Sequence, residues 1–97
     1  MPIMALHRTP SLTKERYEEV IRRLTGKEPP IESLGELPFE GILFHATGQT
    51  SEGFCVVDIF EDEEAIDRFR EALGTIPAEV GIEVPPEFFP AHTYAPS

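Results

Sequence analysis

The chain has 97 residues, which fits one domain over residues 1–97 that buries only about 60–65% of the surface of its unfolded form. Its acidic composition gives a net charge of −10, and a field of that sign repels phosphate backbones, so we expect no nucleic-acid partner. An apolar span of roughly 20 residues and an export signal are both missing, and the single Cys55 cannot form an internal disulfide, which together predict a cytoplasmic protein without a membrane partner.

The first expected elements are a strand and a helix. Residues 2–8 read as a strand, because Pro10 disfavours helix in the residue before it and removes a hydrogen-bond donor. Ser11 or Thr13 can cap the helix that follows, and Gly26 is its natural end. Apolar residues recur along it at the i, i+3, i+4, i+7 spacing of one helical face: Tyr17, Val20, Ile21 and Leu24.

The middle of the chain predicts a connection and a hairpin. Residues 27–40 contain three prolines and no clear period, so they form either a long surface connection or a lid. Residues 41–47 form a second strand, and residues 54–60 form a third. Between them, residues 48–53 have the composition of a turn, which makes the pair a β-hairpin.

The last expected elements are a second helix and an edge strand. Four acids at residues 61–64 suit the positive end of a helix dipole, and Pro77 is expected to end this helix. Residues 82–94 contain Pro85, Pro86 and Pro90, so they can pair only as an interrupted edge strand. The order strand-helix-strand-strand-helix-strand predicts an α+β, ferredoxin-like βαββαβ domain with a four-stranded antiparallel sheet.

The middle strands predict a homodimer. Strict alternation along the third strand places Cys55, Val57 and Ile59 on the face opposite Asp58, and the second strand is likewise apolar on both sides. Two amphipathic helices cover one face only, and a second copy of the chain is the simplest cover for the other. Covering a few hundred Å2 per subunit, at about 25 cal/mol per Å2, would contribute several kcal/mol.

With the elements placed, the junction between the third strand and the second helix, Val56-Val57-Asp58-Ile59-Phe60-Glu61-Asp62-Glu63-Glu64-Ala65-Ile66-Asp67-Arg68-Phe69, resembles that of the dimeric α/β-barrel superfamily, specifically its antibiotic-biosynthesis-monooxygenase-like members. The likeness covers nearly the whole chain, and the ending Pro90-Ala91-His92-Thr93-Tyr94 is also similar. The resemblance implies two four-stranded sheets facing each other across a dimeric α/β barrel, with a pocket between sheet and helices in each subunit.

The resemblance also implies a range of activities. Members oxidise quinols or polyketide-like aromatics without a cofactor, degrade haem, isomerise lactones, or have no known activity. The haem degraders depend on an Asn in the first strand and a Trp at the end of the third. This chain contains neither residue type, and Phe60 stands where the Trp would be, so that activity is not expected.

Asp58 and His45 are the candidate catalytic residues. Asp58 interrupts an apolar strand, and a buried carboxylate must acquire a partner or shift its pKa. It either orients a histidine or accepts a substrate proton at a pocket, or it forms a structural pair with a backbone amide, Arg8 or Arg68. His45 lies on the neighbouring strand and could pair with Asp58 to form a general base, or it could pack at the dimer seam.

Other residues are candidates for ligand contact. An aromatic ligand could be lined by Phe60, Phe44 and Tyr17, although aromatic side chains also fill small cores. His92 is expected on the opposite edge of the sheet and could reach His45 only across a dimer. No metal and no cofactor are expected, since the histidines and Asp58 do not show the spacing of a local ligand pair.

Two functions remain open from the sequence. The first is a cofactor-independent monooxygenase or isomerase, in which His45, supported by Asp58, removes a proton from a phenolic or enolic substrate. The second is a non-catalytic dimer that binds a small ligand or serves a structural role. The partner expected in either case is a second copy of the chain, and a small aromatic ligand is a further candidate partner.

Overall fold

The computed structural model describes residues 1–95 of the chain. In chain order its elements are β1 (Ile3–His7), α1 (Lys14–Thr25), the short 3-10 helix η1 (Leu34–Glu36), β2 (Ile42–Thr50), β3 (Gly53–Phe60), α2 (Glu63–Leu73), α3 (Ile76–Glu79) and β4 (Glu87–Pro90).

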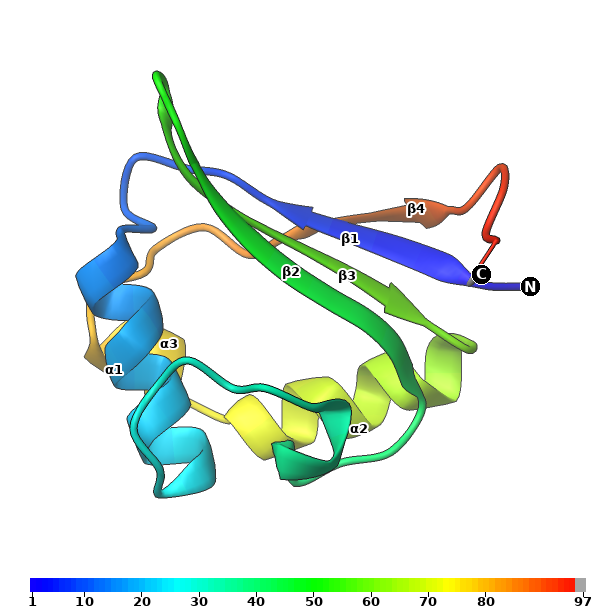
Figure 1. Ribbon diagram of the computed structural model, residues 1–97, viewed down its shortest axis with the longest axis horizontal. Coiled ribbons are helices and arrows are strands. Elements are labelled where there is room, and N and C mark those ends of the chain that lie inside the picture. The colour runs from blue at the N-terminus through cyan, green and yellow to red at the C-terminus, as the bar shows by residue number, and fades with distance from the viewer. Residues whose placement is uncertain (96–97) are drawn as a thin grey trace.

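The four strands form one antiparallel sheet in the order β2-β3-β1-β4. All three α-helices lie on the same side of this sheet, with α1 and α3 under one end and α2 under the other (Figure 1). The predicted α+β class and four-stranded antiparallel sheet are therefore confirmed, and the arrangement is compatible with a ferredoxin-like fold. The other face of the sheet carries no helix (Figure 1).

Helix α1 has the predicted ends. The Thr13 side-chain oxygen accepts a hydrogen bond from the backbone N–H of Arg16 at 3.2 Å, which satisfies one of the unpaired donors of the first turn. Gly26 ends the helix with a φ of 73°, a left-handed conformation that glycine adopts at little cost. Within residues 1–95, no helix has both the length and the apolar character needed to cross a bilayer.

Three element boundaries differ from those predicted. Helix α2 ends at Leu73, next to Gly74, and Pro77 is the second residue of α3, where a missing N–H is tolerated. The last strand is confined to Glu87–Pro90, because Pro85 and Pro86 cannot donate to a ladder. Strand β2 continues beyond residue 47 to Thr50, so the hairpin is longer than predicted.

A β-bulge in β2 interrupts the alternation of its side chains between the two faces of the sheet. Ile42 pairs with Phe60, but the next paired residue is Phe44, which lies opposite Ile59, so Leu43 is the extra residue. Strict alternation was therefore wrong here: Ile42 shares the helix-facing side with His45 and not the side of Phe44.

Gly41 sets the start of β2 against α2. Its φ is 96°, and a Cβ atom at this position would lie 2.5 Å from the Ala65 Cβ and 2.9 Å from the Arg68 Nη2. The Gly41 carbonyl also accepts a hydrogen bond from the N–H of Glu61 at 2.8 Å. Only glycine allows this close approach, which fixes the strand just before the bulge.

The core consists of two clusters under the two ends of the sheet. The first contains Leu12, Val20, Phe54, Val56 and Ile82, with Tyr17 and Leu73 among the residues packed against it. The second contains Ala5, Phe60, Ala65 and Ile66, with Phe39, Ile42, Phe69 and Phe88 packed against it. Residues of both clusters line a cavity between the sheet and the helices.

Candidate functional site

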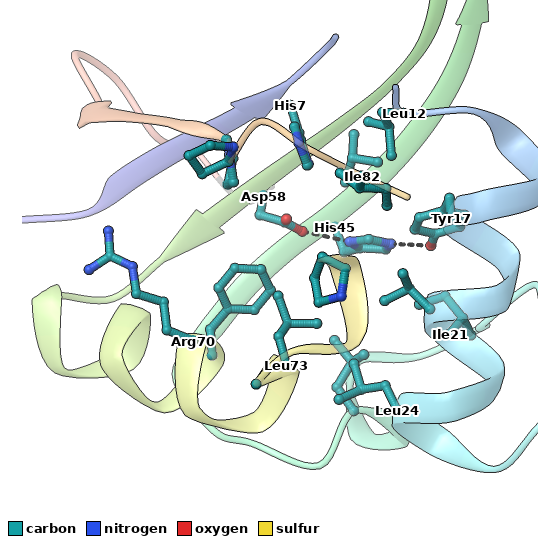
Figure 2. Close-up of a pocket in the computed structure, with 18 of the residues that line it drawn as sticks. His7, Leu12, Tyr17, Ile21, Leu24, His45, Asp58, Arg70, Leu73 and Ile82 are labelled. Atoms are coloured by element: carbon teal, nitrogen blue, oxygen red, sulfur yellow. Dashed lines mark hydrogen bonds and ion pairs between the residues drawn. The ribbon is translucent and has the colours of Figure 1, made fainter. Parts of the chain in front are cut away.

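A cavity of about 510 Å3 lies between the sheet and the helices. Residues from both core clusters line it, together with residues 82–86, so its wall is predominantly apolar. Figure 2 shows a few polar side chains set into this wall. The size and the sparse polar groups are those of a small-molecule site, for which volumes of about 300–1,000 Å3 are usual.

Three of the polar side chains form a continuous hydrogen-bonded chain (Figure 2). The Nδ1 atom of His45 lies 2.5 Å from Oδ1 of Asp58, and the Nε2 atom of the same ring lies 2.6 Å from the hydroxyl of Tyr17. Both ring nitrogens of His45 are therefore engaged. We call Tyr17, His45 and Asp58 the triad.

The sheet register brings His45 and Asp58 together. The two residues are direct partners in the β2–β3 ladder, and side chains of directly opposite residues point to the same face. The bulge at Leu43 precedes His45 and sets which residues of β2 face the helices. Tyr17 reaches the histidine from the inner face of α1, where its ring lies near that of His45 with a centroid distance of 5.9 Å.

Burial makes these hydrogen bonds necessary. The side chain of His45 is 12% exposed and that of Asp58 is 9% exposed, so neither group is well solvated by water. A buried carboxylate without partners is costly, and here its partner is His45. Neither Arg8 nor Arg68 takes that role; the Arg68 side chain donates to the carbonyl of Glu40 at 3.2 Å.

The surroundings raise the pKa of Tyr17 from 10.0 to about 12. Loss of solvent around the phenol is the largest cause, followed by the negative charges of Asp58 and Glu18. Tyr17 is therefore protonated at neutral pH. When the imidazole of His45 is neutral and its Nε2 accepts the Tyr17 O–H, the ring proton lies on Nδ1 and is donated to Asp58.

The triad can move a proton. A neutral imidazole held by a carboxylate on one nitrogen can accept a proton on the other, because the carboxylate stabilises the imidazolium that forms. In this cavity the group on the accepting side is the Tyr17 hydroxyl. A hydroxyl can receive one proton as it passes on another, so Tyr17 can connect a molecule in the cavity to His45.

The structure separates the other residues that the sequence suggested for ligand contact. Phe60 is 0% exposed and packs in the core without lining the cavity. Phe44 lies on the opposite face of the sheet, where it is 43% exposed. His92 is exposed beyond β4 and contacts Thr93. Of the predicted set, the cavity wall contains Tyr17, His45 and Asp58.

The sequence reasoning missed Arg70 and the connection before β4. Arg70 lines the cavity from α2, and its signal was present: it occupies the i+4 position after Ile66, inside the apolar stripe of the helix. Residues 82–86 also line the cavity. The carbonyl of Val84 accepts a hydrogen bond from Nε2 of His7 at 2.6 Å, which ties this connection to the end of β1.

The residues described by the structure do not form a metal-binding group. Within positions 1–95, no three His, Cys, Asp or Glu side chains come together in a way that could hold a metal ion.

The chain matches no protein-family model, no curated protein and no solved structure. The geometry of the cavity therefore carries the functional assignment.

Proposed function

We propose that the protein binds a small aromatic or enolic molecule in the cavity and removes a proton from it without a cofactor. The observation that supports this most strongly is the hydrogen-bonded chain from Tyr17 through His45 to Asp58 on the wall of an apolar cavity. Enolisable ketones, among them the keto forms of polycyclic phenols, are substrates for which removal of a C–H proton is the difficult step.

The proposed proton path starts at Tyr17. The substrate gives a proton to the Tyr17 oxygen while the phenol proton moves to the Nε2 of His45. The products are the substrate anion, neutral Tyr17 and a His45 imidazolium whose Nδ1–H remains on Asp58. Because the pKa of Tyr17 is raised, the tyrosine passes the proton on and does not accumulate as an anion.

Two outcomes of the substrate anion fit the cavity. In an isomerase, His45 returns the proton through Tyr17 to a different carbon of the same molecule. In a monooxygenase, the substrate carbanion bonds to dioxygen and reduces it to a peroxide anion, which takes the proton back from His45 through Tyr17. The resulting hydroperoxide then loses water to leave a ketone. Both reactions share the first step, and the apolar wall protects the anion from water.

The second candidate function is a non-catalytic ligand-binding protein. A specific observation favours it: both nitrogens of His45 are already bonded within the chain. In addition, no buried side-chain nitrogen or oxygen lacks a partner among the described residues. In this case the triad only satisfies the polarity of Asp58, and the cavity holds a ligand that leaves unchanged.

We further propose that the chain works as a homodimer that closes a dimeric α/β barrel. Support comes from the face of the sheet that carries no helix (Figure 1), where Phe44 is 43% exposed. Val57 and Cys55 on the same face are half-buried. A second sheet would cover these side chains without any contribution from the cavity residues.

Hydrogen–deuterium exchange on a substrate panel tests the catalytic proposal. Anthrone and a series of quinols are incubated with the protein in D2O, the loss of substrate C–H signal is followed by NMR, and oxygen consumption is measured in parallel. We expect exchange faster than without protein and lost in His45→Gln. Isomerisation and oxygenation both begin with the substrate anion whose formation this exchange reports.

A matched variant separates the triad from general effects. His92→Gln removes an exposed histidine that lies outside the cavity, and it should retain the wild-type rate. If ligands bind but neither exchange nor oxygen uptake occurs in any case, the non-catalytic function is the correct one. If His92→Gln loses the rate as much as His45→Gln, the triad is not the site.

A further inference from the structure

We propose that Arg70 forms an anion-binding subsite at the rim of the cavity, so that the ligand is an aromatic or enolic acid with its anionic group on Arg70. This inference deepens the proposed function and rests on it in one respect, namely that the hydroxyl or carbonyl end of the ligand lies at Tyr17. The two ends of such a ligand would contact different helices: the anionic end α2, and the hydroxyl or carbonyl end α1.

The position of Arg70 suits a rim group. It lines the cavity, yet its side chain is 61% exposed, so the guanidinium stands where the cavity meets solvent. The guanidinium carbon lies 4.8 Å from the centroid of the Phe88 ring. Stacking on an aromatic face holds the planar group and leaves its N–H edge available for a planar anion such as a carboxylate.

The hydrogen-bonding capacity of Arg70 is largely unused. Its acidic neighbour Asp67 lies 3.9 Å away and is 77% exposed, too far for a hydrogen bond and too well solvated for a strong pair. Among the described residues, Arg70 makes no side-chain hydrogen bond to another group. Four other arginines donate side-chain hydrogen bonds, for example Arg16 to the carbonyls of Ser11 and Gly81.

Arg70 is also the single lysine or arginine in the part of the cavity wall that the structure describes. Two acids line the same cavity, Asp58 and Glu83. The charge of Asp58 is already engaged by His45, and the Glu83 side chain belongs to an exposed residue. The net charge of −10 is screened beyond about 8 Å at physiological ionic strength, so the charges nearest the cavity mouth, Arg70 and the solvated Asp67, act most strongly on a ligand there.

The spacing of the polar groups defines the shape of the ligand. In Figure 2, Arg70 and Tyr17 lie on opposite sides of the His45–Asp58 pair, with Leu73 between the two helices. Apart from the polar groups named, the cavity wall is mostly apolar and includes Phe69 and Phe88. A flat hydrocarbon body with an anion at one end and a hydroxyl or carbonyl at the other fits this pattern.

Two fluorescent probes with the same rings test the subsite. One is 8-anilinonaphthalene-1-sulfonate, which is anionic, and the other is N-phenyl-1-naphthylamine, which lacks the sulfonate. We expect Arg70→Gln to weaken binding of the sulfonate about tenfold, the effect of one charge-assisted hydrogen bond, and to change binding of the neutral probe less than about twofold. Arg70→Lys should give an intermediate loss, because it keeps the charge without the planar fork.

Two further variants locate the effect. Arg8→Gln removes the same charge from an exposed residue that does not line the cavity, and it should leave both affinities unchanged. Leu73→Trp fills the cavity and should weaken both probes. Arg70 also borders a smaller cavity of about 400 Å3 beside β4; if Leu73→Trp leaves sulfonate binding intact, the anion lies there and the inference is overturned.

Two further outcomes of the probe experiment would contradict the Arg70 subsite. Equal losses in Arg70→Gln and Arg8→Gln would show a general charge effect, and failure of the wild type to bind either probe would show that the cavity does not admit such ligands. Both results overturn the subsite. Because the probes undergo no reaction, a subsite confirmed without any proton exchange on the substrate panel would reject catalysis and retain the ligand class.

Discussion

The two faces of the sheet differ in where polar and apolar side chains lie. The face packed against the helices contains a carboxylate, and the face without helices carries apolar side chains. On the face covered by helices, β3 carries a buried carboxylate, Asp58, between the apolar residues Val56 and Phe60. On the face without helices, the same strand carries the half-buried Val57 and the buried Ile59, and the neighbouring β2 carries Phe44, which is 43% exposed.

Each departure has its own physical consequence. A carboxylate inside an apolar layer persists only with partners, and those partners, His45 and Tyr17, are groups that can transfer protons. An apolar surface facing water favours association with a further surface. The proposed proton transfer therefore rests on the covered face, and the proposed dimer rests on the uncovered face.

The largest expected effect concerns the covered face. His45→Gln should slow proton exchange on a substrate by about 10²–10⁴-fold, the usual contribution of a positioned acid–base group. Tyr17→Phe interrupts the same path, so the double variant should be no slower than the slower single variant. Losses that multiply in the double variant would show that Tyr17 and His45 act separately.

Stability, unlike activity, should recover when both members of the His45–Asp58 pair are replaced. His45→Leu leaves Asp58 buried without a partner and should lower the free energy of unfolding by about 3 kcal/mol. Adding Asp58→Leu removes the stranded charge and should restore most of that loss, as judged by urea unfolding, while activity stays absent. If the double variant is no more stable than His45→Leu, Asp58 is not the source of the cost.

The uncovered face gives a smaller, concentration-dependent effect. Phe44→Glu places a charge where the second sheet is proposed to pack and should weaken dimerisation at least about tenfold, as measured by sedimentation equilibrium. Gln49→Glu is the matched control, since Gln49 is exposed on the same strand and pairs with Phe54 on the other face. Sedimentation of the wild-type chain as a monomer at micromolar concentration would contradict the proposed dimer.

The smallest effect is a dependence of stability on alkaline pH. Because folding raises the pKa of Tyr17 from 10.0 to about 12, the unfolded chain releases the phenol proton first as pH rises through this window. The free energy of unfolding should therefore decline between those values. Tyr17→Phe should lack this part of the decline; parallel curves for the two proteins would contradict the raised pKa.

Much of the architecture followed from local patterns. The cap at Thr13, the stop at Gly26 and the hairpin of β2 and β3 depend on neighbouring residues, and these predictions were confirmed. The bulge at Leu43 was not predicted, because the alternation of apolar residues in β2 is equally good on either side of it. The end of α2 was misplaced because Pro77 is tolerated in the first turn of α3.

The candidate site was predictable only where it lies within the hairpin. The pairing of His45 with Asp58 is a matter of strand register, whereas the contact of Tyr17 with His45 depends on how α1 packs across the sheet. Phe60 and Phe44 could not be separated from cavity residues by type, since an aromatic side chain serves equally well in the core, on the outer face or in a binding site. Only the spatial arrangement distinguishes these three places.

The state of the His45 ring is the most direct test of the account. Nitrogen-15 NMR of the histidine side chains, assigned with His45→Gln, reports which ring nitrogen carries the proton. We predict that the neutral form of the His45 ring carries its proton on Nδ1 and that its Nε2 resonance moves in Tyr17→Phe. A proton on Nε2, or rapid averaging of the two tautomers unaffected by Tyr17→Phe, would show that the triad does not exist in solution.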